Sequence, residues 1–595
     1  RQMCIRDSYN TGTVNGTNGV GGVCGDTSRH VIDLPSITNC YNTGAVSGKE
    51  SIGGVCGSCN ENIIKNCYNT GAVTGSGLII GGICGYSSDG STISSCYNTG
   101  AVSGNSWGFG GVCGVRESST VITNCYYNKD ICTVGGIDDS DVDGSATGLT
   151  ADELCGELPT GFDSSVWTAG SYSVVTDSEN EKMRSAKHTF PSLTDVGETY
   201  VVSVKQYNFG TSNNDWQEYT LISTADEFKA LVNDSSAWNK NYVLGADIDL
   251  GGAEITPIGN STTKFTGKFS GDGHIVSNFK INKPDTDYVG LFGYSNGIII
   301  ELGVENIEVI GNKYVGGICG SNDGTIRNCS SAASVKGKSY VGGVCGVNTN
   351  GTITNCHNEG TTNGRSGTVG GVCGGNRGGK VTNCYNEGTV NGSYEVGGVC
   401  GYNTYDSNSG TVENCYNTGA VSGNGNIGGI CGNNYTGTIS SCYNTGAVSG
   451  NENVSGICRN NNGTVTNCYY NKNVCTAGGI NGGDVDGSAT GLTPDEFCKT
   501  LPNGFESSVW TAGNIDPSID SKNPRLRTAT YIFPSLTGVG KAYSVSDIKQ
   551  YNFGINGNDD WQEYTLISTP EEFKALTKDG ADWKKNYVLG ADIDL

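Results

Sequence analysis

Short runs in which apolar and polar residues alternate recur along most of this chain, and each run ends at glycine or asparagine. In Gly-Thr-Ile-Thr-Asn-Cys (residues 351–356), Ile353 can point inward while Thr352 and Thr354 point outward, which is the two-residue period of a β-strand. The density of glycine, threonine and asparagine disfavours a helix in these stretches. The pattern therefore predicts an all-β protein built from short strands.

Two short phrases alternate along the chain, and each carries a cysteine. In the first phrase, Gly-Gly-(Val/Ile)-Cys-Gly, the cysteines are Cys24, Cys56, Cys84, Cys113, Cys319, Cys345, Cys373, Cys400, Cys431 and, in a degenerate copy, Cys458. In the second, usually Asn-Cys-Tyr-Asn-Thr-Gly-Ala-Val-Ser-Gly, they are Cys40, Cys67, Cys96, Cys125, Cys329, Cys356, Cys384, Cys415, Cys442 and Cys468. Consecutive cysteines of the second phrase lie 26 to 31 residues apart within each block. This period predicts a parallel β-helix (β-solenoid) in which each coil holds two or three short strands.

A longer repeat contains these coils, because residues 125–250 return as residues 468–595. We therefore expect the end of one solenoid, a complete second solenoid and the start of a third, all within a fragment of a longer protein. Residues 1–8 fit no coil and are predicted to be a non-native leader. The predicted segments are this leader, the C-terminal part of the first solenoid (9–135), a closing segment and linker (136–215), the second solenoid with its opening unit (216–478), a second closing segment and linker (479–560) and the start of a third, truncated solenoid (561–595).

Short helices are predicted where the β pattern stops. Thr493-Pro494-Asp495-Glu496 reads as an N-cap, a proline at the first helical position and a capping-box glutamate. The same N-cap threonine and capping-box glutamate, with proline between them only in the last case, open segments at Thr150, Thr224 and Thr569. We expect the helices at Thr150 and Thr493 to close a solenoid and the other two to open one, because an uncovered end of a β-stack would pair with other chains.

Composition narrows the classes of function. The chain holds 94 glycines, 26 cysteines and two methionines among 595 residues, and its formal net charge is −23. No cluster of lysine and arginine of the kind that binds phosphate appears, so we expect no nucleic-acid partner. No apolar run is long enough for a membrane-spanning helix.

The two cysteine columns read as apolar core. In the opening coil of the second solenoid, Phe292 stands where later coils have the first cysteine and Leu302 stands where they have the second. Positions that accept Phe or Leu favour buried packing, although coils about 4.8 Å apart leave systematic disulfides open as an alternative. Outside the columns, Cys132 and Cys155 recur with the same separation as Cys475 and Cys498, which suggests a disulfide between each closing helix and its last coil.

Tyrosine follows the second cysteine in most coils. We expect these tyrosines to form one column on the outside of the solenoid, where a flat aromatic strip is suited to stack on sugar rings. The alternative is that the stacked rings only stabilise neighbouring coils. The candidate ligand-binding residues are Tyr41, Tyr68, Tyr97, Tyr385, Tyr416 and Tyr443.

One acidic segment resembles the start of a calcium-binding loop. Asp139, Asp141 and Asp143 alternate before a glycine, as the first ligands of such a loop do. The twelfth position is Thr150 rather than glutamate, and Gly482 replaces Asp139 in the second copy. Calcium is the one cofactor that the sequence suggests, and an acidic turn before a capped helix is the alternative.

The two cysteine phrases resemble the GLUG repeat of bacterial surface proteins, which often has Gly-Gly-Leu-Val-Gly where this chain has cysteine. The opening unit, with Ala246-Asp247-Ile248-Asp249-Leu250, looks like the start of GLUG solenoids. The resemblance implies an exported β-helix of bacterial adhesins or of the non-catalytic part of some immunoglobulin-A-cleaving metalloproteases. The His-Glu-x-x-His motif of such proteases is absent from this chain.

The predicted function is a non-enzymatic structural or adhesive repeat module of a large secreted or cell-surface bacterial protein. Its expected partner is a glycan or a host surface, and its oligomeric state is left open. Nearly every coil repeats its neighbour, so no coil offers the unique cluster of charged residues that an active site needs. A carbohydrate-active β-helix enzyme and the accessory region of a surface metalloprotease are the alternatives.

Overall fold

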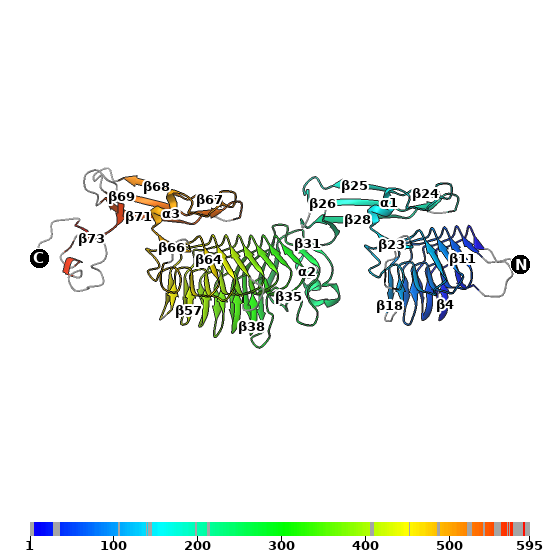
Figure 1. The fold of residues 1–595 in the computed structure, drawn as a ribbon, viewed down its shortest axis with the longest axis horizontal. Coiled ribbons are helices and arrows are strands. Elements are labelled where there is room, and N and C mark those ends of the chain that lie inside the picture. Colours follow the sequence, from blue (N-terminus) through cyan, green and yellow to red (C-terminus); the bar gives the residue numbers. More distant parts are fainter. Residues whose placement is uncertain are drawn as a thin grey trace. The chain divides into compact units, whose positions relative to one another are not determined.

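The structure is a computed structural model, and it describes residues 5–27, 36–104, 108–138, 140, 145–196, 199–210, 215–404, 410–451, 453–484, 488–519, 526–539, 542–552, 561–567, 569, 572–574 and 587–589. The chain divides into two compact units, Arg1–Glu218 and Tyr219–Leu595. Each unit contains a parallel β-solenoid followed by a closing segment of helix and antiparallel strands (Figure 1). The predicted all-β solenoid with short capping helices is therefore confirmed.

In the first solenoid a coil holds five short strands rather than the two or three that the sequence predicted. One coil consists of β6 (Ser36–Thr38), β7 (Tyr41–Asn42), β8 (Val46–Gly48), β9 (Glu50–Gly53) and β10 (Cys56–Cys59). Each strand pairs in parallel with its equivalent in the next coil, so that Ile37 lies opposite Ile64. Glycine and asparagine between the strands turn the chain often, which explains why the strands are so short.

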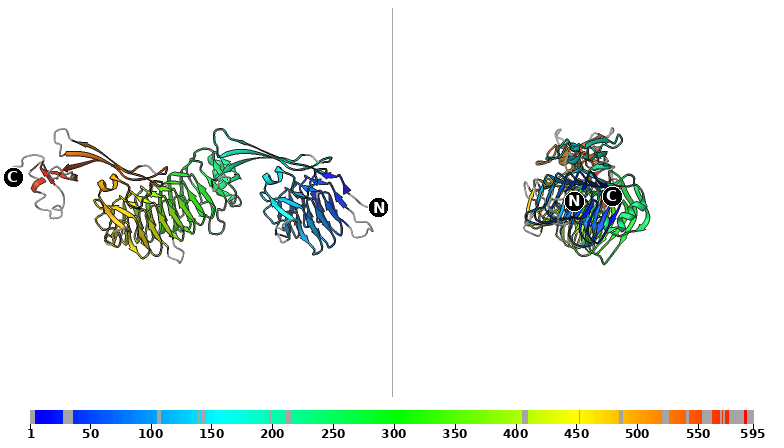
Figure 2. Two further views of the ribbon diagram at one scale, coloured as in Figure 1. Left: turned by 45° about the horizontal axis from the view of Figure 1, so that its top comes forward. Right: turned by 90° about the vertical axis from the view of Figure 1, so that its right-hand side faces the viewer.

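The second solenoid begins with fewer and longer strands. Its coil of β40 (Thr325–Arg327), β41 (Ser330–Gly337), β42 (Ser339–Gly342) and β43 (Cys345–Thr349) has four strands. In the next coil the equivalent of β41 is divided into β45 (His357–Asn358) and β46 (Thr362–Gly364). Sheets of ten, fourteen, seven and six strands therefore follow the length of the solenoid, and Figure 2 shows the stacked coils from a second direction.

The interior consists of columns of small apolar side chains. The cysteines of both phrases are free thiols and all are buried except the half-buried Cys24. Phe292 pairs with Cys319, and Cys345 pairs with Cys373, in one in-register sheet. The prediction of apolar core columns is confirmed. Each thiol also donates to a nearby backbone carbonyl, as Cys345 does to the Val347 oxygen at 3.2 Å.

Asparagine amides form ladders beside this core. The asparagines that precede the second cysteine have left-handed backbones, and Asn355 donates to the Asn328 side chain at 3.0 Å. A second ladder consists of the asparagines that follow the column tyrosines. Asn386 donates to Asn417 and Asn417 to Asn444, each at 2.7 Å, and all three are fully buried. Because each amide also donates to a glycine carbonyl, the ladder satisfies polar groups inside the solenoid wall.

The helices begin where the capping motifs predicted. They are α1 (Ala151–Gly156), α2 (Ala225–Asn233) and α3 (Pro494–Lys499), and each has a complete capping box between its N-cap threonine and a glutamate three residues on. The backbone N–H of Thr150, which donates to the Glu153 carboxylate, lowers the pKa of that carboxyl. At Thr569, both reciprocal bonds with Glu572 are also present. No helix in the described ranges is both long enough and apolar enough to cross a membrane.

The first residues contradict the prediction that 1–8 fit no coil. Ile5 and Arg6 form β1, which pairs in parallel with β6 and places Ile5 opposite Ile37. Tyr9 then lies opposite Tyr41, as expected for the column. One inward apolar residue at the right distance before the tyrosine is enough to extend the sheet. The sequence prediction relied on the cysteine phrases, which these residues lack, and therefore missed this strand.

Candidate functional site

The tyrosines after the second cysteine form the predicted column. In the first unit the rings of Tyr41 and Tyr68 lie 4.8 Å apart and almost parallel, and those of Tyr68 and Tyr97 lie 5.1 Å apart. In the second unit the Tyr385, Tyr416 and Tyr443 rings repeat this stack at 4.7 and 5.1 Å. Each ring therefore contacts the equivalent ring of the neighbouring coil along its face.

The predicted exposure of this column is wrong. Its six tyrosines are at most 2 % exposed: Tyr41, Tyr68, Tyr97, Tyr385, Tyr416 and Tyr443. The closing segment of each unit folds back along the side of the solenoid and buries these tyrosines, so we call it the cover. Burial raises the pKa of the Tyr443 hydroxyl, which donates to the Pro534 carbonyl at 2.5 Å. The rings are therefore inside a hydrophobic interface, and no sugar has access to them.

A tryptophan is central to each cover. In the first unit Trp167, in β24 (Trp167–Thr168), lies 5.7 Å from the Tyr97 ring and 4.6 Å from Phe162. In the second unit Trp510, in β67 (Trp510–Thr511), takes the same place. The closing segment is thus a lateral cover rather than the end cap that the sequence suggested. The last coils instead pair with β23 (Ala146–Leu149) and β66 (Ala489–Leu492).

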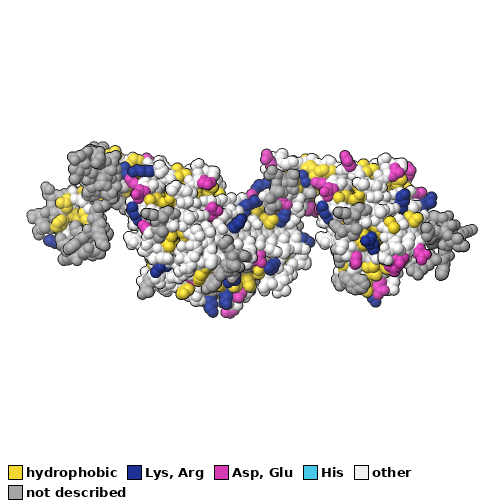
Figure 3. Space-filling view, in the orientation of Figure 1, with side chains coloured by type: hydrophobic (Ala, Val, Ile, Leu, Met, Phe, Trp, Pro, Cys, Tyr) yellow, Lys and Arg dark blue, Asp and Glu magenta, His cyan; other side chains and the backbone are white. Residues whose placement is uncertain are grey.

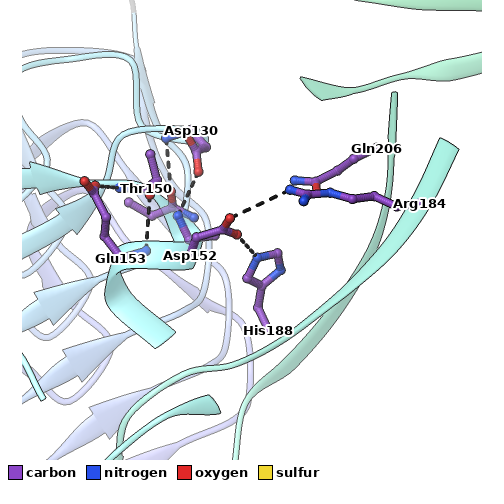
Figure 4. A network of polar contacts seen from close by, with 9 residues as sticks. Asp130, Thr150, Asp152, Glu153, Arg184, His188 and Gln206 are labelled. Atoms are coloured by element: carbon purple, nitrogen blue, oxygen red, sulfur yellow. Dashed lines mark hydrogen bonds and ion pairs between the residues drawn. The ribbon is translucent and has the colours of Figure 1, made fainter. Parts of the chain in front are cut away.

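A polar network fastens the first cover to its helix (Figure 4). Asp152, in the first turn of α1, accepts a hydrogen bond from the buried His188 at 2.6 Å. The Arg184 guanidinium lies 3.9 Å from the same carboxylate and donates to Gln206 at 2.7 Å. His188 and Arg184 belong to β26 (Met183–Thr189) and Gln206 to β28 (Val201–Asn208). The Asp152 carboxylate therefore connects the helix to β26, and Arg184 extends the network to β28.

The second unit builds the same junction from different side chains. Tyr531 replaces His188 and donates its hydroxyl to Asp495, while Arg527 lies 3.6 Å from that carboxylate. Arg527 donates to Gln550 at 2.6 Å, as Arg184 does to Gln206. Because a tyrosine hydroxyl makes the equivalent bond in the second unit, His188 serves here as a hydrogen-bond donor that joins the helix to the strand.

Removal of the shared carboxylate should loosen the first cover. In Asp152→Ala the buried His188 ring loses its acceptor and Arg184 its ion-pair partner, which we expect to destabilise the cover by about 1–3 kcal/mol. Hydrogen exchange at the β26 amides should accelerate, while exchange in the coils stays unchanged. Asp495→Ala should have the same effect at β69 (Leu526–Ile532). Unchanged exchange at β26 would show that the network does not hold the cover.

The two disulfides predicted outside the columns are absent. Cys155, Cys475 and Cys498 are free thiols, so neither the Cys132–Cys155 nor the Cys475–Cys498 bond is formed. The members of each pair lie in different hydrophobic clusters. Cys132 and Cys475 pack inside the solenoids, whereas Cys155 and Cys498 pack beneath the covers. Burial raises the pKa of Cys155 and Cys498 to about 12, so both thiols stay protonated.

The candidate calcium ligands Asp139, Asp141 and Asp143 lie outside the described residues. Within the described ranges no group of three His, Cys, Asp or Glu side chains is arranged to hold a metal ion. In the second copy, Asp484 accepts hydrogen bonds from the Tyr470 hydroxyl at 2.6 Å and from the Gly479 N–H at 3.0 Å. These contacts hold a turn together at this position.

A second tyrosine stack, which sequence reasoning missed, lies on another side of the second solenoid. The Tyr288 and Tyr314 rings are 4.9 Å apart, as are those of Tyr314 and Tyr340, and all three residues are half-buried with left-handed backbones. Tyr294 extends the stack beyond Tyr288, and the Lys264 ammonium lies 4.1 Å from its ring centre.

An arginine closes the other end of this stack. Arg377, at the end of β48 (Cys373–Arg377), lies over the Tyr340 ring at 5.4 Å. Its Nε donates to the Tyr402 hydroxyl at 2.6 Å and its Nη2 to the Tyr340 hydroxyl at 3.4 Å. We call Tyr288, Tyr314, Tyr340 and Arg377 the tyrosine–arginine surface. The signal for it in the sequence is Tyr-Val-Gly, which recurs 26 residues apart at Tyr288, Tyr314 and Tyr340.

Comparison with known proteins supports the repeat assignment. The GLUG motif matches residues 311–336, 337–363, 366–391 and 392–422, which lie in the second solenoid. The resemblance to GLUG-repeat surface proteins that the sequence suggested is therefore confirmed.

Two relatives share part of this chain. Halomucin of Haloquadratum walsbyi is 37% identical over 131 residues, which are 20% of this chain and 1% of halomucin. A putative Gly-rich membrane protein of Evansella cellulosilytica is 38% identical over 92 residues, which are 15% of this chain and 11% of that protein. The matched region is thus a small part of both relatives.

Among solved structures, a putative immunoglobulin A1 protease from Bacteroides ovatus shares 19% identity, with a TM-score of 0.35 over 54% of this chain and 92% of that one. The GLUG repeats and the names of the two curated relatives together fit a repeat module of a large surface protein.

Proposed function

We propose that this chain is a non-enzymatic structural and adhesive module of a large, exported cell-surface protein. The observation that carries the proposal is the uniformity of the coils. From one coil to the next the same small side chains fill the interior and the same amides line the wall, so each added coil adds length and lateral surface. The tyrosine column does not contribute a ligand site, because the covers bury it.

The side-chain chemistry agrees with a role without catalysis. The polar network at His188 is reproduced by Tyr531 in the second unit and serves the fold in both. The thiols of the two cysteine columns are buried, apart from the half-buried Cys24. A structural role in a surface protein also agrees with the GLUG repeats and with the names of the halomucin and membrane-protein relatives.

Two experiments test this proposal. Antibodies raised against residues 219–552 should label intact cells that produce the full-length protein, and brief protease treatment of those cells should remove the label. Label that appears only after the cells are broken would contradict a surface location. Separately, the purified chain should release no reducing ends from a panel of polysaccharides, and sustained turnover would contradict the non-enzymatic assignment.

A further inference from the structure

We propose that the tyrosine–arginine surface of the second solenoid binds an acidic polysaccharide, whose carboxylate or sulfate groups pair with Arg377 and with neighbouring basic side chains. This inference goes beyond the proposed function and does not depend on where the protein is located.

The Arg377 guanidinium is held in place and has more N–H donors than its hydrogen bonds to the protein use. A guanidinium carries five N–H donors, and the two protein hydrogen bonds of Arg377 go to the Tyr402 and Tyr340 hydroxyls. Within the described residues it forms no ion pair with a carboxylate, although the chain as a whole carries a net charge of −23. The tyrosines hold the guanidinium in place, so little rotamer freedom is lost when its remaining donors bind a planar or tetrahedral anion.

The tyrosine stack contributes hydroxyl groups rather than ring faces. The faces of the Tyr314 ring are both covered, by Tyr288 on one side and Tyr340 on the other. The hydroxyls of Tyr288 and Tyr314 have no hydrogen-bond partner in the part of the chain that the structure describes. A row of phenol hydroxyls at the spacing of the coils therefore stands beside Arg377. Such groups both donate to and accept from sugar hydroxyls.

A basic rim accompanies this row. Lys313 precedes Tyr314 in β38 (Lys313–Gly316), and Lys338 and Arg365 lie in the turns of the next two coils. All three side chains are exposed, and none forms an ion pair among the described residues. Figure 3 shows basic side chains along the edge of the second solenoid where β38 lies, with hydrophobic and acidic side chains among them. Together with Arg377, these three basic residues place four cations on three consecutive coils, because Arg365 and Arg377 belong to the same coil.

The sparse spacing of these cations favours an acidic polysaccharide over a nucleic acid. A DNA duplex carries about one negative charge per 1.7 Å, so its affinity depends on dense clusters of lysine and arginine. The surface offers about one cation per coil, and the rest of the chain repels a polyanion of such high charge density. A chain with one charge on each sugar or on every second sugar matches the surface better. Its hydroxyls also suit the phenol row.

The purified full chain can be tested against four defined polymers. Polygalacturonate presents carboxylates, dextran sulfate presents sulfates, dextran is uncharged, and single-stranded DNA represents the nucleic acids. At about 50 mM salt we expect one or both acidic polysaccharides to bind, with at least about tenfold weaker binding at 500 mM, and dextran not to bind. The stronger of the two acidic polymers identifies the anion. Failure of both to bind, or DNA binding as tightly as either, would overturn the proposal.

Three variants then locate the site. Lys338→Gln with Arg365→Gln, which changes only exposed side chains, should weaken binding about fivefold, and Arg377→Gln about tenfold. Tyr314→Phe keeps the ring stack but removes a hydroxyl, and should weaken binding about threefold. The control is Lys380→Gln, which removes one exposed charge from β49 (Lys380–Thr382) in another sheet and should leave affinity unchanged. If the double variant binds like Lys380→Gln while both remain folded, the ligand is not held at this surface.

Discussion

Trp510→Ala is expected to release the cover of the second unit from its solenoid. The Trp510 side chain is 1% exposed, and its ring centre lies 4.5 Å from that of Phe505 and 5.6 Å from that of Tyr443. Truncation to alanine removes the ring that contacts both Tyr416 and Tyr443, while other cover residues keep their contacts with Tyr443. Large-to-small changes of buried aromatic residues cost about 3–5 kcal/mol. The solenoid keeps its own core of stacked columns. The loss of stability should therefore be confined to the cover.

Hydrogen exchange and limited proteolysis separate these two outcomes. The amides of β68 (Asn514–Ile519) and β69 should exchange much faster in Trp510→Ala than in the wild type, and proteases should cleave the cover while the coils stay intact. The matched control is Tyr394→Ala, because Tyr394 is an aromatic residue of the same unit that is 58% exposed. If exchange in β68 and β69 is the same in wild type and variant, Trp510 does not anchor the cover.

Features fixed by neighbouring residues could be predicted from the sequence. Phe292 stands at a cysteine position, and this one substitution identified the column as apolar core and gave its register. The capping boxes gave the helix starts, because an N-cap threonine and a glutamate three residues on form both bonds locally. The number of strands per coil was underestimated, because frequent glycine and asparagine turns break each side of the coil into shorter strands.

Features that depend on distant segments could not be predicted in this way. The Tyr97 hydroxyl donates to the Pro191 carbonyl, 94 residues further along the chain. The residues next to Tyr97 in the sequence give no indication of that contact. Exposure of the column was therefore judged without the segment that covers it. The disulfide prediction failed for the same reason, because the equal separation of Cys132 from Cys155 and of Cys475 from Cys498 reflects a repeated chain rather than contact between the thiols.

Solenoid geometry also limits what a tyrosine column can bind. In a parallel stack, equivalent side chains are one strand spacing apart, about 4.8 Å, so aromatic rings lie face to face with their neighbours. The Tyr385–Tyr416 pair at 4.7 Å and the Tyr288–Tyr314 pair at 4.9 Å both show this arrangement, although one stack is covered and the other is not. Only edges and hydroxyls remain available to a ligand. Recognition by such a column therefore depends on polar groups rather than on stacking.

Gly397→Ala is expected to destabilise the second solenoid by about 3 kcal/mol. A Cβ atom at Gly397 would lie 1.9 Å from the Cys400 carbonyl oxygen and 2.7 Å from the Ile430 carbonyl oxygen, and neither backbone atom can turn aside. The Ile430 oxygen also accepts the Val399 and Cys400 N–H groups at 3.0 and 2.9 Å. Space for the methyl group therefore requires that the two coils separate where they are joined.

The place where Gly397→Ala destabilises the solenoid distinguishes a clash between coils from a general effect of replacing glycine. Denaturant unfolding should show a lower midpoint for Gly397→Ala, and hydrogen exchange should accelerate first at Cys400 and Cys431, which pair across the two coils. Gly483→Ala is the control, because the nearest atom to its added Cβ is 3.9 Å away. An equal midpoint in both variants would mean that the coils tolerate the methyl group. A loss confined to Gly397→Ala would show that the first glycine of the cysteine phrase is required for the close approach of successive coils, and its repetition would then explain much of the high glycine content of the chain.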